Sequence, residues 1–186
     1  MRLPHLPSVV FLDRDGVLIE NVPTYIREWG EVQLFEQAAQ ACSILSKRGI
    51  PLIVVTNQSG IGRGILTHET AERLNRQILA EIEFIGAKFL DSYMCPHSPD
   101  DGCDCRKPRP GMLVRASRDH NLDLTRAIFV GDSATDLEAA EAAGVTGVLV
   151  RTGRGREQEQ VLVSQGKKPI VFRDLLAVVA AMAPQP

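Results

Sequence analysis

The sequence contains little cysteine, few aromatic residues and almost no net charge. Its 186 residues include four cysteines and 5% aromatic residues, and 21 Lys and Arg against 23 Asp and Glu give a net charge of −2. Without a basic excess, the chain lacks the electrostatic attraction that recruits nucleic acids or anionic membranes. We therefore expect no nucleic-acid or membrane partner, and any bound anion must be held by local groups.

Long apolar runs are also missing. The first run, "VVFL" at 9–12, is four residues long, and no later run approaches the roughly 18 apolar residues of a membrane-spanning helix. These features predict a soluble cytoplasmic protein, in which thiols stay reduced. Clustered cysteine and histidine residues in such a protein bind metal more often than they form disulfides.

The length and the pattern of the chain predict one α/β domain over residues 1–186, which we expect to be a monomer. A chain of this size is long enough for one well-packed domain and short for two. Apolar segments that predict strands alternate with segments that predict helices. Short apolar strands separated by helices indicate a Rossmann-like parallel sheet with helices on both faces. The predicted strands are 8–13, 51–57, 87–94, 126–132, 146–150 and 169–172, and the predicted helices are 36–49, the segment after Thr67, 111–120, 133–144 and the segment after Arg173.

Polar side chains follow three of the strongest predicted strands. Asp13 and Asp15 end the first, Thr56 and Asn57 the second, and Asp132 a later one. Ligands bind at the carboxyl ends of parallel strands, so we expect these residues at one edge of the sheet. If the extended backbone persists, Asp13 and Asp15 project to the same side, and with Asp132 they make an oxygen-rich cluster suited to Mg²⁺. The alternative is an acidic turn that merely ends a strand.

Three of the four cysteines lie with a histidine in the proline-rich stretch 95–108. The spacing is C-x-H-x5-C-x-C, and three thiolates with one imidazole complete a closed tetrahedral zinc site. A loop over 95–105 buries little core of its own, so a bound metal has a structural purpose. Reduced free thiols or a disulfide are the alternatives. The zinc ligands predicted by this pattern are Cys95, His97, Cys103 and Cys105.

Four segments resemble the motifs of the haloacid dehalogenase superfamily of phosphatases. The resemblance covers roughly residues 9–150 and implies a Mg²⁺-dependent phosphatase. It implies that Asp13 attacks phosphorus to form an aspartyl-phosphate, and that Asp15 acts first as general acid and then as general base. The four motifs, in chain order, are "DRDGV" (13–17), "VVTNQSG" (54–60), "CRKPRPGM" (105–112) and "VGDSATD" (130–136).

The resemblance also implies roles for the remaining motif residues. Thr56 and Lys107 would hold the oxygens of the transferred phosphoryl group, and Asn57 and Arg106 would contact the substrate. Mg²⁺ would be bound by Asp13, by the backbone carbonyl of Asp15 and by Asp132. A metal-site role and a helix-surface role both stay open for Asp136, and Arg63 is an ambiguous anion contact.

The spacing of the motifs leaves no room for a separate cap domain, so substrate choice must depend on residues 18–30 and the zinc loop. The zinc loop resembles those of two capless groups, the heptose-bisphosphate 7-phosphatases of bacterial heptose synthesis and the histidinol-phosphate phosphatases. The motifs together with "RTGRG" (151–155) resemble the first group more closely, although Ser133 stands where some relatives carry lysine. A sugar bisphosphate is the implied substrate, and Arg106 would recognise its second phosphate bidentately.

Two further classes share parts of this pattern. A nucleic-acid 3′-phosphatase would carry the same motifs, but it needs a basic groove with aromatic residues for stacking, which the composition does not favour. A zinc-stabilised interaction module without activity would have lost a motif residue, yet all four motifs keep theirs. Both alternatives are therefore less well supported than a small-molecule phosphatase.

Overall fold

The computed structural model describes residues 6–182, in which six parallel strands form a single sheet. The strand order is β3-β2-β1-β4-β5-β6, so β1 lies in the interior between β2 and β4. The strands are β1 (Val10–Leu12), β2 (Leu52–Asn57), β3 (Phe89–Cys95), β4 (Ile128–Gly131), β5 (Thr146–Val150) and β6 (Ile170–Phe172).

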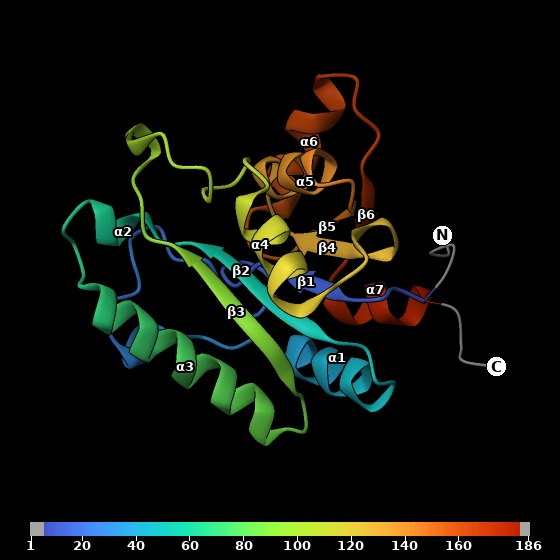
Figure 1. The fold of residues 1–186 in the computed structure, drawn as a ribbon, viewed down its shortest axis with the longest axis horizontal. Helices are drawn as coiled ribbons and strands as arrows, with labels where there is room; N and C mark the ends of the chain where they lie inside the picture. Colours follow the sequence, from blue (N-terminus) through green and yellow to red (C-terminus); the bar gives the residue numbers. More distant parts are fainter. Residues whose placement is uncertain (1–5, 183–186) are drawn as a thin grey trace.

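Helices cover both faces of this sheet, as Figure 1 shows. Helices α1, α3 and α7 lie on one face, and α4, α5 and α6 lie on the other. The predicted Rossmann-like α/β fold is confirmed, and no separate cap domain is inserted within residues 6–182. The helices are α1 (Glu36–Lys47), α2 (Ser59–Gly62), α3 (His68–Phe84), α4 (Gly111–His120), α5 (Ala134–Ala142), α6 (Gly155–Ser164) and α7 (Leu175–Ala181).

The side chains of the central strand divide between two hydrophobic cores. Val10 and Leu12 pack in the core beneath α1, α3 and α7, whereas Phe11 packs in the core beneath α4 and α5. Successive side chains of a strand point to opposite faces, so a strand that is apolar at every position needs cover on both sides. The predicted strands are apolar at successive positions because both faces of the sheet are buried beneath helices.

Local sequence signals explain where two of the helices begin and end. Thr67 caps the start of α3, and its hydroxyl accepts a hydrogen bond from the backbone N–H of Thr70 at 3.1 Å. Gly49 follows the end of α1 with a φ of 70°, a left-handed conformation that glycine adopts without steric cost. Both features agree with the predicted helices.

Helix α6 is the main element that the sequence pattern did not indicate. It buries only Gly155 and Leu162, so its apolar residues lack the helical period on which sequence interpretation depends. The predicted strand 8–13 is also too long, because pairing is confined to Val10–Leu12. The segments beyond it form the turn that carries Asp13 and Asp15.

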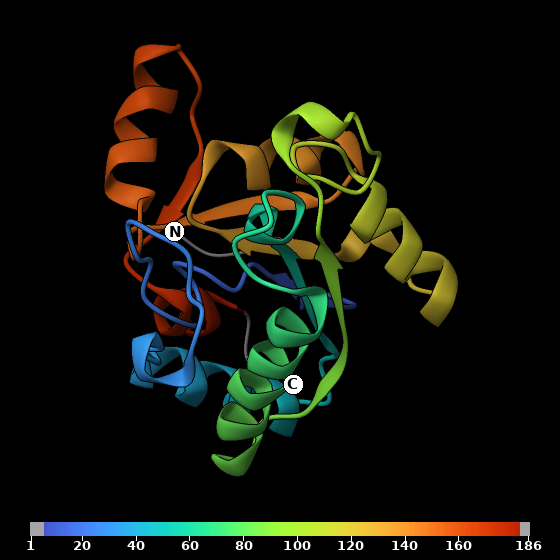
Figure 2. The ribbon, with the colours of Figure 1, turned by 90° about the vertical axis from the view of Figure 1, so that its left-hand side faces the viewer.

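The strand order brings the loops of interest to one end of the sheet. The zinc loop (residues 95–105) follows β3 and α6 follows β5 shortly after its end, and both project from the carboxyl end of the strands (Figure 2). The connections run in opposite directions from β1 and β4, which makes this a topological switch point. Ligand sites of parallel α/β sheets form at such points.

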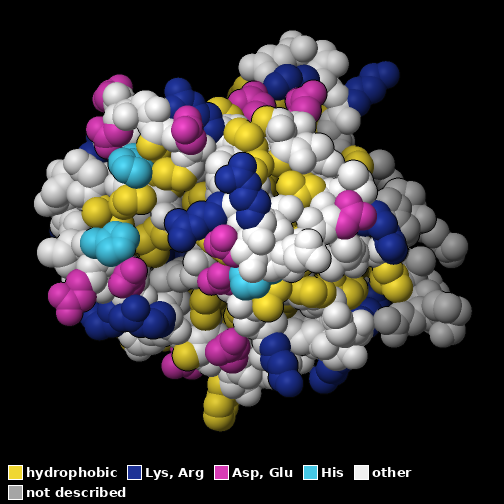
Figure 3. All heavy atoms as spheres, in the orientation of Figure 1, with side chains coloured by type: hydrophobic (Ala, Val, Ile, Leu, Met, Phe, Trp, Pro, Cys, Tyr) yellow, Lys and Arg dark blue, Asp and Glu magenta, His cyan; other side chains and the backbone are white. Residues whose placement is uncertain are grey.

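The surface carries charges of both signs. In the view of Figure 3, lysine and arginine side chains are interspersed with aspartate and glutamate over this face of the molecule. No helix in the described part of the chain, residues 6–182, is long and apolar enough to cross a membrane.

Ile78, within the buried face of α3, and Ile85, the residue that follows the helix, provide a test of the core. Ile78 is fully buried and Ile85 is 49% exposed. We expect Ile78→Ala to lower the free energy of unfolding by about 2–5 kcal/mol, because it removes buried methyl groups and leaves a cavity. Ile85→Ala is the matched control and is expected to change it by less than about 1 kcal/mol. Equal effects in urea unfolding of both variants would contradict the assignment of this helix face.

Candidate active site

A cavity of about 540 Å³ opens at the carboxyl ends of β1, β2 and β4. Three elements that are far apart in the sequence meet here because β1 lies between the other two strands. The cavity contains every residue that the sequence predicted for the catalytic edge. The predicted residues that line it are Asp13, Asp15, Thr56, Asn57, Arg106, Lys107, Asp132 and Asp136.

Three buried carboxylates form the centre of the site. Asp13, Asp132 and Asp136 each place a carboxylate oxygen within 4.8 Å of the other two, and their exposed fractions are 8%, 3% and 0%. Asp136 comes from the first turn of α5, where its carboxylate accepts hydrogen bonds from the backbone N–H and hydroxyl of Ser133 at 3.0 and 2.6 Å. Asp136 therefore belongs to this carboxylate cluster and not to the helix surface.

The Asp15 carboxylate lies outside the cluster. Both of its oxygens accept hydrogen bonds from the Arg14 guanidinium at 3.1 Å, and Oδ2 accepts another from Gln58 at 2.9 Å. The expectation that Asp13 and Asp15 project to the same side assumed an extended backbone. Pairing of β1 stops at Leu12 and the chain turns at Gly16, whose φ is 86°, so the two carboxylates separate.

Lys107 is the buried cation of the site. Its Nζ lies 2.9 Å from Asp13 Oδ1 and 2.7 Å from Asp136 Oδ1, and it donates a hydrogen bond to the Val55 carbonyl at 3.0 Å. The ammonium also lies 5.3 Å from the centre of the Phe129 ring. A lysine that is 5% exposed needs such partners, because an unpaired buried charge is strongly unfavourable.

Burial and mutual repulsion set the protonation of these groups. Burial raises the pKa of Asp13 well above its usual value, and the charge of Lys107 offsets part of that effect. Burial, followed by the charge of Asp136, raises the pKa of Asp132 to about 6, against the opposing charges of Lys107 and Arg154. Burial alone lowers the pKa of Lys107, but the charges of Asp13 and Asp136 outweigh it and raise that pKa. One ammonium therefore does not fully compensate the three carboxylates, and burial and mutual repulsion disfavour their charged forms in the absence of a further cation.

The carboxylate cluster fits a hard divalent cation. Asp136 Oδ1 is fully buried, and the Lys107 ammonium 2.7 Å away is shared with Asp13 Oδ1 and the Val55 carbonyl. Mg²⁺ prefers a few carboxylate oxygens together with water and substrate phosphate. The donor set and its excess negative charge are both appropriate for this ion.

Asn57 holds the backbone that carries Lys107. Its side-chain nitrogen donates to the Lys107 carbonyl at 3.1 Å, and its side-chain oxygen accepts from the Lys107 N–H at 3.1 Å. Two hydrogen bonds across 50 residues of sequence fix the position of that peptide unit. Contact with substrate was the predicted role of Asn57; the geometry also makes it the residue that positions the lysine.

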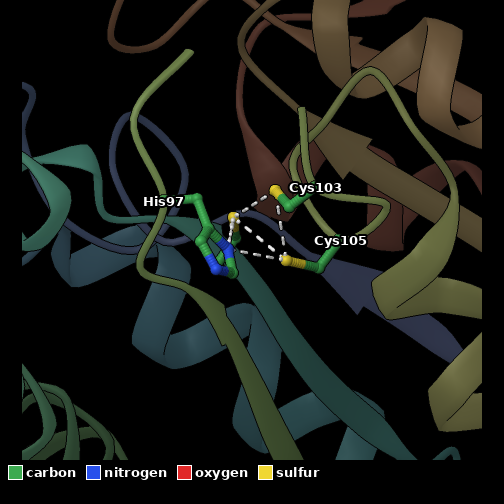
Figure 4. A group of neighbouring side chains, drawn as sticks. His97, Cys103 and Cys105 are labelled. Atoms are coloured by element: carbon green, nitrogen blue, oxygen red, sulfur yellow. Dashed lines mark hydrogen bonds between the residues drawn. The ribbon is translucent and has the colours of Figure 1, made fainter. Parts of the chain in front are cut away.

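The four predicted zinc ligands converge, as Figure 4 shows for His97, Cys103 and Cys105. The Cys105 sulfur lies 3.3 Å from Cys95 Sγ, 3.5 Å from Cys103 Sγ and 3.3 Å from His97 Nδ1, and all four cysteines of the chain are free thiols. Ligand atoms about 2.0–2.3 Å from a tetrahedral zinc are separated by about these distances. The group can therefore hold a metal ion, and the disulfide alternative is not present.

Two of the three clustered thiols, Cys95 and Cys105, favour the protonated form, whereas the burial of Cys103 is outweighed by hydrogen bonds from its neighbours, which lower the pKa of that thiol. Burial raises the pKa of Cys95, and burial together with the neighbouring thiols raises the pKa of Cys105 to about 12. A bound cation replaces such protons. The fourth cysteine, Cys42, is fully buried in α1, as expected for a small core residue.

The zinc loop is hydrogen-bonded to the segment that follows β2. The Cys95 carbonyl accepts from the Gln58 N–H at 2.8 Å, and the Pro96 carbonyl accepts from the Gly62 N–H at 2.8 Å. The Arg106 guanidinium donates to the His97 carbonyl at 3.2 Å. Because Gln58 also donates to Thr56 and Asp15 at 2.9 Å each, the zinc loop and the catalytic side chains share one hydrogen-bonded network.

Several residues of the site were missed by the sequence interpretation. Asn21 donates to Asp132 Oδ2 at 2.6 Å, and the Arg154 N–H donates to the same oxygen at 2.9 Å. Gln58 and Arg14 orient Asp15. Both lie inside the motifs at 54–60 and 13–17, so their positions in these motifs could have indicated that they belong to the site. Asn21 lies in the segment 18–30, which the sequence linked to substrate choice without indicating this residue. Arg63 is exposed and is not among the residues that line the cavity.

The chain is similar to proteins of known family. A family model described as HAD-hydrolase-like matches residues 104–178. The chain is 39% identical over 171 residues to the D-glycero-beta-D-manno-heptose-1,7-bisphosphate 7-phosphatase of Pseudomonas putida, covering 92% of this chain and 97% of that protein. It is also 39% identical over 175 residues to the protein of the same name from Pseudomonas aeruginosa, covering 94% and 97%.

A solved structure is similar over nearly the whole chain. It is the D,D-heptose 1,7-bisphosphate phosphatase of B. bronchiseptica complexed with magnesium and phosphate, with a TM-score of 0.86, 35% sequence identity and coverage of 93% of this chain and 96% of that one. Identity at this level, extended over almost the full length of the relatives, establishes the family. The chain belongs to the D-glycero-D-manno-heptose-1,7-bisphosphate 7-phosphatase family of haloacid-dehalogenase-like hydrolases.

Proposed function

We propose that this protein is a Mg²⁺-dependent phosphatase that removes the 7-phosphate of D-glycero-D-manno-heptose 1,7-bisphosphate. The observation that carries the proposal is the carboxylate cluster with its single buried lysine. Asp13, at the end of the central strand, lies 2.9 Å from Lys107 Nζ and faces the cavity. The proposed substrate is inferred from the names of the similar proteins, and the proposed reaction is inferred from the residues that line the cavity.

Asp13 is the proposed nucleophile. One of its carboxylate oxygens forms a bond to phosphorus as the bond between phosphorus and the C7 oxygen breaks, which leaves a phosphoryl group on Asp13. The Arg14 N–H and Lys107 both contact Asp13 Oδ1, at 2.7 and 2.9 Å. Those contacts orient the carboxylate and leave its other oxygen for the attack.

Asp15 is the proposed acid and base. It donates a proton to the departing C7 oxygen, and it then removes a proton from the water that attacks the phosphoryl group on Asp13. That water releases inorganic phosphate and restores the Asp13 carboxylate. The side chain of Asp15 is 25% exposed and is separate from the carboxylate cluster, which supports proton exchange with solvent.

Thr56, Lys107 and a divalent cation are proposed to stabilise the negative charge on the phosphoryl oxygens. Thr56 is 1% exposed and its hydroxyl is held by Gln58 at 2.9 Å. Preorganised donors in a dry site stabilise developing charge without reorganisation. Asp13, the backbone carbonyl of Asp15 and Asp132 would hold Mg²⁺, with Asp136 beside them in the carboxylate cluster. The ion would neutralise phosphate charge and favour the ionised carboxylates.

Zinc is proposed to be structural. Three thiols and one imidazole complete its coordination and leave no open position for substrate. Its proposed contribution is to fix the loop from which Arg106 and Lys107 extend, in keeping with the hydrogen bonds that join this loop to Gln58 and Gly62. Arg106 lines the cavity and is proposed to contact the phosphate that is not transferred.

Removal of the nucleophile is the first test. Asp13→Asn is expected to lower Mg²⁺-dependent phosphate release by at least about 10³-fold. The variant is expected to stay folded, because burial already disfavours the charged form of this carboxyl. Phosphate release and thermal melting measure the two effects. Asp100→Asn, an exposed aspartate in the zinc loop, is the control, and full activity in Asp13→Asn contradicts the mechanism.

Removal of one zinc ligand tests the structural metal. Cys103→Ser is expected to reduce bound zinc, measured by elemental analysis, and to lower the melting temperature and activity together. Cys42→Ala removes a thiol elsewhere and is expected to retain one zinc per chain. A zinc-free Cys103→Ser protein with wild-type activity would show that the loop does not position the phosphate-binding cations.

A comparison of substrates tests the proposed specificity. We expect kcat/KM for heptose 1,7-bisphosphate to exceed that for histidinol phosphate by about 100-fold or more, since a second phosphate adds charge-assisted hydrogen bonds. Phosphate release from both substrates is measured with one preparation. A preference for histidinol phosphate, or for a 3′-phosphorylated oligonucleotide, would overturn the substrate assignment and leave the chemistry intact.

A further inference from the structure

The loop at 151–155 lies against the active site on the side opposite the zinc loop. It follows β5, whereas the zinc loop follows β3, and β2, β1 and β4 lie between those two strands. Arg154 from this loop and Arg106 from the segment after the zinc loop both line the cavity. The cavity is therefore flanked by one guanidinium from each side.

The backbone of this loop is attached to the catalytic residues. The Thr152 hydroxyl donates to the Gly16 carbonyl at 2.6 Å, and the Arg154 N–H donates to Asp132 Oδ2 at 2.9 Å. A Cβ at Gly153 would lie 2.3 Å from Asp132 Oδ2, and a Cβ at Gly155 would lie 1.7 Å from the Val150 carbonyl oxygen. The close approach of the loop thus requires both glycines, and it fixes the point from which the Arg154 side chain extends.

The charge of Arg154 acts on Asp132, but its guanidinium is not paired with any side chain in the described part of the protein. Among residues 6–182 it has no ion pair and no side-chain hydrogen bond, and it is exposed at the edge of the cavity. Arg151, in the same loop, instead forms a bidentate salt bridge with Glu159, with N–O distances of 2.6 and 2.8 Å. Of the two arginines, Arg154 is the one available to a ligand.

The other charged groups of the cavity already have defined positions. Lys107 is buried between Asp13 and Asp136, at the end where the phosphoryl group is transferred. Ser133, which also lines the cavity, is uncharged, and its hydroxyl donates a hydrogen bond to Asp136 at 2.6 Å. This side chain therefore provides no positive charge for an anion. Besides Lys107, the cations that line the cavity are Arg106 and Arg154.

We propose that Arg154 binds the phosphate that is not transferred, opposite Arg106, and so selects bisphosphate over monophosphate substrates. The inference rests on the proposed function, which provides a substrate with a phosphate at each end. A phosphate monoester carries a charge of about −1.5 to −2 at neutral pH, and guanidinium groups match its oxygens with paired donors. One guanidinium on each side holds this group while Asp13 attacks the other.

The test compares two substrates that differ only in the second phosphate. Wild type and Arg154→Gln are assayed with heptose 1,7-bisphosphate and with heptose 7-phosphate. The substitution is expected to lower the ratio of kcat/KM values, bisphosphate over monophosphate, by about tenfold or more, mainly through KM. Arg154→Lys is expected to recover part of the ratio. The melting temperature should stay unchanged, because the contact with Asp132 comes from the backbone.

Arg156→Gln is the matched control, since Arg156 is exposed in α6 and is not among the cavity residues. An equal loss with both substrates overturns the inference and assigns Arg154 to the transferred phosphoryl group. An unchanged ratio in Arg154→Gln overturns it as well, while the proposed function stands. A wild-type protein that does not prefer the bisphosphate contradicts the proposed function and the inference together.

Discussion

The burial of Lys107 between Asp13 and Asp136 is the interaction on which the rest of the site depends. Three carboxylates within 4.8 Å of one another repel and lose hydration. One ammonium at 2.9 and 2.7 Å offsets part of that cost. The negative charge that remains is the reason why the site suits a divalent cation, and the cation in turn admits a phosphate. One divalent cation would balance the three ionised carboxylates and the one ammonium.

The position of Lys107 depends in turn on contacts far from it in sequence. Asn57 binds both backbone groups of Lys107, and the adjacent residue Gln58 is bound to the end of β3 through the Cys95 carbonyl. The ends of β2 and β3 and the segment after the zinc loop therefore form one unit. A metal bound by the Cys/His group would fix one end of this unit, because backbone hydrogen bonds join the zinc loop to the segment after β2.

The fold, the convergence of the Cys/His group and most of the polar residues that line the cavity could be predicted from local patterns. Continuous apolar strands such as Leu52–Asn57 require cover on both faces, and so they indicate a parallel sheet. Parallel strands place their carboxyl ends together, which brings Asp13, Thr56 and Asp132 to one cavity. The spacing of Cys95, His97, Cys103 and Cys105 likewise determined the metal group, because the ligands lie in one short loop.

Only the tertiary structure decided which carboxylates form the cluster and what surrounds it. The sequence predicted a cluster of Asp13, Asp15 and Asp132, but the third carboxylate in the structure is that of Asp136. The Asp15 side chain is turned away because the chain turns at Gly16, and Asp136 reaches the cluster from the first turn of α5 beside the end of β4. Asn21 and Arg154 reach Asp132 from positions 111 and 22 residues away. Sequence patterns determine which residues follow the carboxyl end of each strand, because the strand itself is specified by neighbouring residues along the chain. Which of them meet depends on how the loops pack, and such contacts have no local signature.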